Sequence, residues 1–185
     1  MNRLEDYILT VEGVIPNHLC DAILAEYMLC DDWVDAVVSG GQQPDIRSCR
    51  TIATSMPIII EKNKDVRQKL DEDLFKCASM AIKQYNSKFK NSSIEEDSGY
   101  ELLEYSKGQF YKEHVDSFKG RPRSVSCSFA LNDEYTGGEF AFFGGELQVQ
   151  IPKGAALMFP SNFMYPHQIL PVTSGMRYSI VTWFI

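Results

Sequence analysis

Three side chains in the second half of the chain are of the types that bind a transition metal. His114 and Asp116 lie two residues apart in FYKEHVDSF, and His167 follows the turn PSNFMYP. The segment 110–118 is predicted to be a strand, where residues i and i+2 point to the same face. Two histidines and one carboxylate on one face leave three adjacent coordination positions open, as in non-haem Fe(II) oxygenases.

These residue types also have ordinary roles. A polar pair on an exposed loop, or a structural histidine in a strand, is more common than a metal site. The third histidine of the chain, His18, falls in the first turn of an expected helix, and we expect it on the surface. His167 is therefore the remaining partner for His114.

Arg177 favours the metal hypothesis. It lies ten residues after His167 and begins RYSIVTWFI, a strand of core-type residues. A turn at VTSG would let this strand return antiparallel beside the histidine strand. A buried guanidinium is costly without an anion, and its planar fork suits a carboxylate. The sequence predicts a small dicarboxylate between the metal and Arg177, and a surface salt bridge is the alternative.

The first half of the chain is expected to be helical with supporting strands. LTVEGVIP indicates a short strand, and residues 16–28 a helix with Asn17 as its N-cap. Residues 50–60 have strand character that Pro57 interrupts. A second helix is predicted over residues 61–89. Its apolar face is expected to consist of Val66, Leu70, Leu74, Cys77, Ala78, Ala81 and Tyr85.

After Tyr100 the sequence changes to short apolar or alternating runs between glycines and prolines. Eight such runs occur, namely YELLEYS, FYKEHVDSF, SVSCSFALN, GEFAFF, ELQVQIP, GAALMFP, HQILPV and RYSIVTWFI. Eight short strands are typical of a jelly roll. The predicted fold class is α+β, with the N-terminal helices packed outside a jelly-roll core.

Composition limits the classes of partner. The chain has 185 residues, which predicts one domain over 1–185, and its net charge of −7 argues against nucleic-acid or anionic-membrane partners. No apolar run approaches the ~20 residues of a membrane span, and we expect no signal peptide. Five scattered cysteines without a CxxC pair indicate reduced thiols and a cytoplasmic protein. One segment differs from the overall negative charge: KGRPR, residues 119–123, is basic and follows the HVD segment closely in the sequence.

Four segments together resemble the 2-oxoglutarate- and Fe(II)-dependent dioxygenases of the prolyl 4-hydroxylase type. They are YSKGQFYKEHVD, ALNDEYTGGEFAF, PKGAALMFPS and PHQILPVTSGMRYSIVTWF. The order HxD, GGE, FP and HxxxPVxxGxR is highly specific, whereas VIPNHLCDAILAEYM resembles the family's helical lead-in more weakly. The resemblance implies a double-stranded β-helix catalytic core over 100–185, with 1–99 as a helical lead-in and supporting strands.

The resemblance also implies a cofactor site. Fe(II) would be held by His114, Asp116 and His167. The co-substrate 2-oxoglutarate would chelate the iron and bind Arg177 through its far carboxylate, and these four residues would be the catalytic set. Tyr105 matches a tyrosine that helps to bind 2-oxoglutarate, although it could instead be a core aromatic residue.

Three further residues correspond to positions near the substrate. Tyr111 matches a tyrosine that lines the reaction cavity, Arg123 a peptide-contacting arginine, and Trp183 an aromatic of the pocket wall. A core aromatic or a solvated loop charge is the alternative for each. Collagen-type enzymes carry lysine in place of Arg177 and threonine in place of Phe140, which puts a collagen-like substrate in doubt. The loops at 40–49 and 117–124 are expected to form the lid, and the glycine pairs 137–138 and 144–145 to serve turns rather than ligands.

The expected activity is hydroxylation of a substrate C–H bond, with O2 consumed and succinate and CO2 released, and with ascorbate as a further cofactor. The expected substrate is a prolyl residue in a peptide or protein. A free amino acid or small metabolite is the first alternative, and base repair a weaker one. The alternative of another class is a jelly-roll binding module without turnover, which intact ligands argue against. A zinc hydrolase is weaker still, because no HExxH occurs.

Overall fold

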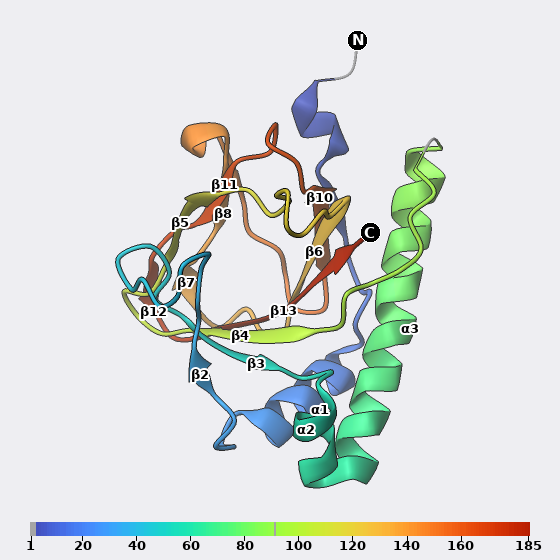
Figure 1. The fold of residues 1–185 in the computed structure, drawn as a ribbon, viewed down its shortest axis with the longest axis vertical. Coiled ribbons are helices and arrows are strands. Elements are labelled where there is room, and N and C mark those ends of the chain that lie inside the picture. The colour runs from blue at the N-terminus through green and yellow to red at the C-terminus, as the bar shows by residue number, and fades with distance from the viewer. Residues whose placement is uncertain (1–2, 91) are drawn as a thin grey trace.

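Antiparallel sheets with few helices make up the structure, a computed structural model that describes residues 3–90 and 92–185 (Figure 1). The strands are β1 (Leu9–Val11), β2 (Val34–Asp35), β3 (Arg50–Ala53), β4 (Glu101–Tyr105), β5 (Tyr111–His114), β6 (Val125–Ala130), β7 (Thr136–Gly137), β8 (Phe140–Phe142), β9 (Leu147–Val149), β10 (Ala156–Pro160), β11 (His167–Ile169), β12 (Val172–Ser174) and β13 (Arg177–Phe184). The α-helices are α1 (Asn17–Tyr27), α2 (Pro57–Ile60) and α3 (Lys64–Lys88), and the 3-10 turns are η1 (Leu4–Tyr7), η2 (Glu61–Asn63) and η3 (Phe143–Gly145). No helix in the described ranges is both long and apolar enough to cross a bilayer.

The strands form two main sheets. The larger has the order β1-β10-β6-β13-β4-β3-β2, and the smaller has the order β5-β11-β8-β9. Strands β12 and β7 pair separately. Each pairing between these strands is antiparallel. The two sheets face each other, because Phe142 of the smaller sheet and Phe159 of the larger lie with ring centroids 4.9 Å apart.

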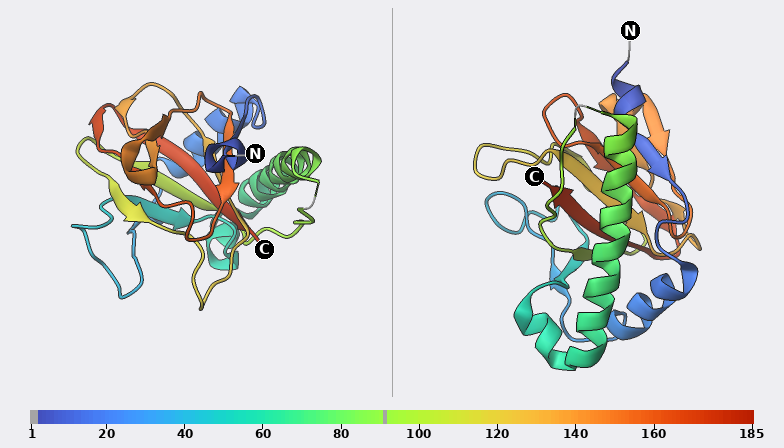
Figure 2. Two further views of the ribbon diagram at one scale, coloured as in Figure 1. Left: turned by 90° about the horizontal axis from the view of Figure 1, so that it is seen from above. Right: turned by 90° about the vertical axis from the view of Figure 1, so that its right-hand side faces the viewer.

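One face of the larger sheet packs against the helices. Side chains alternate along a strand, so Ile180 and Phe184 of β13 share this face. They belong to one buried cluster with Ile23 of α1 and Leu74 of α3. Figure 2 shows α3 running across the sheet from end to end. Helix α3 therefore covers this face of the larger sheet and excludes water from it, because apolar residues recur along the helix at three- and four-residue spacing.

The other face of the larger sheet points toward the smaller sheet. Leu103 and Tyr105 of β4 lie in a second buried cluster with Phe140 and Ile169 of the smaller sheet. Between the sheets this cluster closes one end of a cavity of about 670 Å³. Alternation in β13 aims Arg177, Ser179, Val181 and Trp183 into that cavity, whose walls therefore come from strands far apart in the sequence.

Of the predicted α+β fold with a jelly-roll core, the structure confirms the coarser description of mostly antiparallel sheets with few helices. Three local predictions are wrong. Pro16, not Asn17, is the N-cap of α1, and Asn17 is the first helical residue. Pro57 begins the helical turn α2 instead of interrupting a strand, because proline fits the first position of a helix. Val66 is 43% exposed, since the buried face of α3 begins at Arg67 and Leu70.

Candidate active site

The three predicted metal ligands meet at one end of the cavity. His114 ends β5 and His167 begins β11, and these two residues lie directly opposite each other in the antiparallel pair. Their ring centroids are 4.3 Å apart. The prediction that Asp116 shares a strand with His114 is wrong, because β5 ends at His114 and Asp116 lies in the following loop. The loop nevertheless returns its carboxylate to the two imidazoles.

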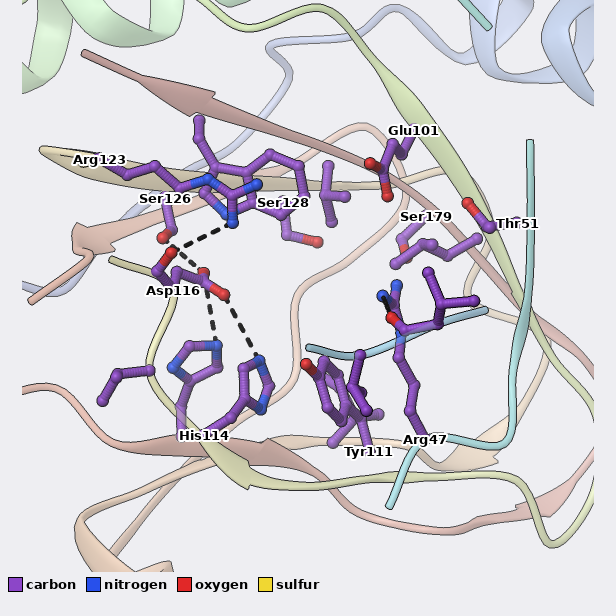
Figure 3. A pocket seen from close by; sticks show the side chains of 18 of the residues that line it. Arg47, Thr51, Glu101, Tyr111, His114, Asp116, Arg123, Ser126, Ser128 and Ser179 are labelled. Carbon is purple, nitrogen blue, oxygen red and sulfur yellow. Dashed lines mark hydrogen bonds and ion pairs between the residues drawn. The ribbon is translucent and has the colours of Figure 1, made fainter. Parts of the chain in front are cut away.

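The donor atoms of these residues surround one point. His114 Nε2 lies 3.4 Å from Asp116 Oδ1, and His167 Nε2 lies 3.6 Å from Asp116 Oδ2 (Figure 3). One donor atom from each residue lies within 4.8 Å of the others. Two imidazole nitrogens and a carboxylate oxygen at this spacing fit a single divalent transition metal with open positions.

Hydrogen bonds behind the ligands orient them. His114 Nδ1 donates to the Lys112 carbonyl oxygen at 2.9 Å, and His167 Nδ1 donates to the Tyr165 carbonyl oxygen at 3.1 Å. These bonds leave each Nε2 lone pair directed at the common point. Asp116 is oriented in the same way by a hydrogen bond from Ser126 of β6.

Ser126 supports the carboxylate ligand. Its hydroxyl donates to Asp116 Oδ2 at 2.6 Å. Burial raises the pKa of Asp116, but the two histidines and this hydroxyl outweigh burial and hold the pKa well below its ordinary value. Burial lowers the pKa of His167 to about 4. At neutral pH the site therefore holds an ionised carboxylate and a neutral buried imidazole, the forms that bind metal.

Arg177 enters the cavity from the opposite sheet. The prediction that its strand lies beside the histidine strand is wrong, because β13 pairs with β4 and β6 in the larger sheet. Arg177 is only 3% exposed and donates from Nη1 to Ser179 Oγ at 2.9 Å. Its Nε is buried without a partner, and no ion pair to Arg177 occurs among the described residues. A buried guanidinium in this condition is prepared for an anionic ligand.

Gly138 makes room for Arg177. Its φ is +69°, and a Cβ placed there would lie 2.9 Å from Arg177 Cδ and 3.1 Å from Val172 Cγ2. The glycine pair 137–138 was expected to serve a turn, and this close approach to Arg177 is a second role for Gly138.

The remaining predicted site residues all line the same cavity. Tyr111 stacks on the His114 ring at 3.6 Å between centroids, and Tyr105 lies under the Arg177 guanidinium at 5.3 Å. The Arg123 guanidinium covers the Trp183 ring at 3.4 Å and donates to the Asp116 carbonyl oxygen at 3.2 Å. The structure therefore brings the whole predicted set together.

Three residues that make contacts in the cavity were not predicted from the sequence. Ser126 donates to Asp116 and shares one face of β6 with Ser128, and Ser179 accepts from Arg177 on the same face of β13. Polar residues at period two in a core strand were the available signal for them. Arg47 also lines the cavity, but it lies in an irregular loop where no periodicity marks a buried side.

Comparisons with known proteins agree with this geometry. Residues 100–185 match the family model described as 2OG-Fe(II) oxygenase superfamily. A PKHD-type hydroxylase of Synechococcus sp. (strain CC9902) is 26% identical over 160 residues, which cover 82% of this chain and 65% of that protein. A PKHD-type hydroxylase of Maricaulis maris (strain MCS10) is 33% identical over 85 residues, which cover 43% of this chain and 38% of that protein. The chain thus spans less than two thirds of the length of these relatives.

Solved structures share the fold over nearly the whole chain. A prolyl hydroxylase of Trichoplax adhaerens, in complex with a hypoxia inducible factor peptide fragment, superposes with a TM-score of 0.78 at 17% identity, covering 97% of this chain and 83% of that one. A prolyl-4-hydroxylase of Pseudomonas putida superposes with a TM-score of 0.69 at 21% identity, covering 96% and 92%. Residues 100–185 therefore match the 2OG-Fe(II) oxygenase superfamily, in agreement with the resemblance, within a chain that shares the fold of these solved prolyl hydroxylases.

Proposed function

We propose that this chain is an Fe(II)- and 2-oxoglutarate-dependent dioxygenase that hydroxylates a prolyl residue of a peptide or protein. One observation carries the proposal. His114, Asp116 and His167 face Arg177 across a single cavity, although the histidines and the arginine come from different sheets. A metal site and a buried unpaired guanidinium in one cavity suit a co-substrate with a chelating end and a distant carboxylate.

The residues present fit both groups. His114, Asp116 and His167 would hold Fe(II), and Arg177 would hold the far carboxylate of 2-oxoglutarate with its unpartnered Nε. When bound, Fe(II) and 2-oxoglutarate supply the oxidative chemistry, in which O2 is consumed, succinate and CO2 leave, and one oxygen atom enters a C–H bond. The protein contributes orientation and a dry cavity.

Aromatic residues of the chain orient the metal ligands and keep water out of the cavity. Tyr111 stacks on His114 and fixes the plane of that imidazole. Phe159 meets the His167 ring edge-on at 4.6 Å, and Phe140 covers the space between Phe159 and Arg177. Because Phe140 and Phe159 are buried, they exclude water from the side of the cavity where the co-substrate would bind.

The prolyl substrate rests on similarity together with the cavity wall. The curated relatives are named PKHD-type hydroxylases, and one structural neighbour holds a peptide fragment. Arg123 and Trp183 line the cavity beside the metal ligands, where a side chain of a bound peptide would enter. The alternatives of a free amino acid substrate and of a binding module without turnover are separated by the assays below.

We further propose that the two facing sheets form a double-stranded β-helix in a single domain over 1–185. Residues 1–99 would provide the helical lead-in and supporting strands, and 100–185 the catalytic core. The TM-score of 0.78 with a prolyl hydroxylase supports this assignment. The cytoplasmic location expected from the cysteine content stays a prediction.

The first test is spectroscopic. Anaerobic addition of Fe(II) and 2-oxoglutarate is expected to give a weak metal-to-ligand charge-transfer band in the visible. His114→Ala is expected to lose this band together with succinate formation. If iron is bound and no band forms, the dioxygenase proposal is refuted, and an unchanged succinate rate in His114→Ala would refute the assigned ligands.

The second test concerns the substrate. Prolyl peptides are expected to raise 2-oxoglutarate consumption above the rate without substrate. Stimulation by free amino acids alone would support the small-molecule alternative. A protein that binds 2-oxoglutarate but never consumes it would support the binding module.

A further inference from the structure

Unsatisfied polar atoms gather in the cavity. Among the described residues, five buried side-chain atoms have no hydrogen-bond partner. Four of them belong to cavity residues, namely Arg47, Thr51, Ser128 and Arg177. Buried polar groups without a partner are rare, and a concentration of them in one cavity indicates where ligand atoms bind. Arg177 is accounted for by the proposed co-substrate, whereas Arg47 is not.

Arg47 sits one aromatic ring away from the metal ligands. Its guanidinium lies 4.8 Å from the centroid of the Tyr111 ring, which in turn stacks on His114. Figure 3 shows Arg47 and Thr51 on the side of the cavity opposite His114, with Tyr111 between them. A group held by Arg47 would therefore lie inside the cavity, close to the reacting position.

The contacts of Arg47 leave its charge unmatched. Its Nη1 donates to the Val37 carbonyl oxygen at 3.2 Å, and its Nε is buried without a partner. The side chains that interact with it most strongly are those of Tyr105, Cys49 and Tyr111, all neutral, and Cys49 also makes a side-chain hydrogen bond with Arg47. In the described part of the chain, no carboxylate lies within ion-pair distance of it. The Val37 carbonyl oxygen and the Cys49 side chain accept hydrogen bonds from the guanidinium, but neither supplies a counter-charge, and Nε stays without a partner.

The balance of charges in the cavity also indicates that Arg47 lacks a counter-charge. Four guanidinium groups line it, those of Arg47, Arg121, Arg123 and Arg177, against the carboxylates of Glu101 and Asp116. Fe(II) and 2-oxoglutarate carry equal and opposite charges, so loading both leaves the excess of positive charge unchanged. Glu101 and Asp116 both act on Arg123. Arg47 is thus a half-buried cation, with a buried Nε, that still lacks a counter-charge.

We propose that Arg47 is a second anion-binding residue of the cavity and that it receives a carboxylate of the primary substrate, which selects acidic over neutral substrates. The inference rests on the proposed function, because it assigns the other anion site, Arg177, to 2-oxoglutarate. The planar fork of Arg47 can meet a carboxylate with two hydrogen bonds, and Thr51 offers a further unpartnered hydroxyl nearby. The carboxylate is either the α-carboxylate of a terminal residue or an acidic side chain.

The test measures binding without turnover. Protein is loaded with Mn(II) in place of Fe(II) and saturated with 2-oxoglutarate, and ligands are titrated by calorimetry. Two matched pairs distinguish the two sources of the carboxylate. N-acetyl-proline against its amide reports a terminal carboxylate, and N-acetyl-prolyl-glutamate amide against the glutamine peptide reports a side-chain one.

In at least one pair, the acid is expected to bind at least tenfold more tightly than its neutral partner. Arg47→Gln is expected to remove that preference and to leave the affinities for the neutral ligand and for 2-oxoglutarate unchanged. Arg3→Gln, which removes the exposed arginine directly before η1, is the control and should keep the preference. If Arg47→Gln does not fold, Arg47→Lys is measured instead and should weaken only the acid.

Three outcomes overturn the inference. The acids and neutral ligands could bind equally, which includes no binding of either; Arg47→Gln could keep the preference; or Arg47→Gln could weaken 2-oxoglutarate instead. Failure of the unmodified protein to bind 2-oxoglutarate, measured before any acid is added, would contradict the proposed function itself. The two failures are therefore distinguishable.

Discussion

Replacing Gly138 by alanine should disturb the co-substrate site without touching a metal ligand. The new Cβ would lie 2.9 Å from Arg177 Cδ, closer than carbon atoms approach in folded proteins. Arg177 is 3% exposed and surrounded by the Tyr105 and Phe140 rings, so its side chain has to move as a unit. The guanidinium would then leave the position from which it faces the metal.

The expected size of the effect has two parts. An alanine in the left-handed region costs about 1 kcal/mol of folding free energy. Displacing a guanidinium from a carboxylate removes charge-assisted hydrogen bonds worth roughly 1.5–3 kcal/mol. The second part converts to an increase of about 10- to 150-fold in the Kd for 2-oxoglutarate. Only this second part depends on Arg177.

Gly144 provides a matched control. Its φ is +68°, almost the same as the +69° of Gly138, and a Cβ there would meet nothing within 4 Å. Gly144→Ala should therefore lose a similar folding free energy and keep its affinity for 2-oxoglutarate. The assay is calorimetric titration of 2-oxoglutarate into Mn(II)-loaded protein, with urea unfolding of each variant and a separate Mn(II) titration.

The reasoning is refuted if the two alanine variants bind 2-oxoglutarate equally. It is also refuted if Gly138→Ala loses Mn(II) affinity to the same extent as co-substrate affinity, since the effect would then be a general disturbance of the cavity. Unchanged Mn(II) binding together with weakened 2-oxoglutarate binding supports the assignment of Arg177.

Three further predictions follow from buried polar contacts. Ser126→Ala removes the hydroxyl that holds Asp116, so Mn(II) affinity should fall by about 10- to 100-fold, whereas Ser128→Ala, whose hydroxyl has no partner, should leave it unchanged; equal losses in the two variants would contradict this. Arg67→Ala removes the guanidinium that pairs with Asp32 and Glu26 and leaves Lys62 as the remaining cation on Asp32, so it should cost roughly 1–3 kcal/mol in urea unfolding, and a loss below 1 kcal/mol would show that Lys62 alone compensates the carboxylate. Burial raises the pKa of Asp32, but its cationic partners lower it below the ordinary value of 3.8, so its contribution to stability is complete above that pH and is lost as pH falls through the folded value. The urea midpoint of the unmodified protein should therefore approach that of Asp32→Asn in acid, and a gap that stays constant with pH would exclude this linkage.

The candidate site residues, and the helical or extended conformation of most segments, could be predicted from the sequence without coordinates. HxD, a later histidine and an arginine ten residues on are a chemical set that can be recognised without coordinates. The three- and four-residue spacing of apolar residues in α3 marks its buried face, because a periodic backbone repeats its side-chain directions. These features depend on neighbours in the chain, which is why they could be predicted.

The way in which the metal ligands and Arg177 come together depends on the tertiary structure. Asp116 reaches the histidines from a loop, and Arg177 faces them from the other sheet. Arg47 gains its place in the cavity, and Gly138 its close contact with Arg177, from packing between segments far apart in the sequence. Which strands pair, and which sheet faces which, is set by hydrogen bonds and burial over the whole chain, and local periodicity carries no record of either.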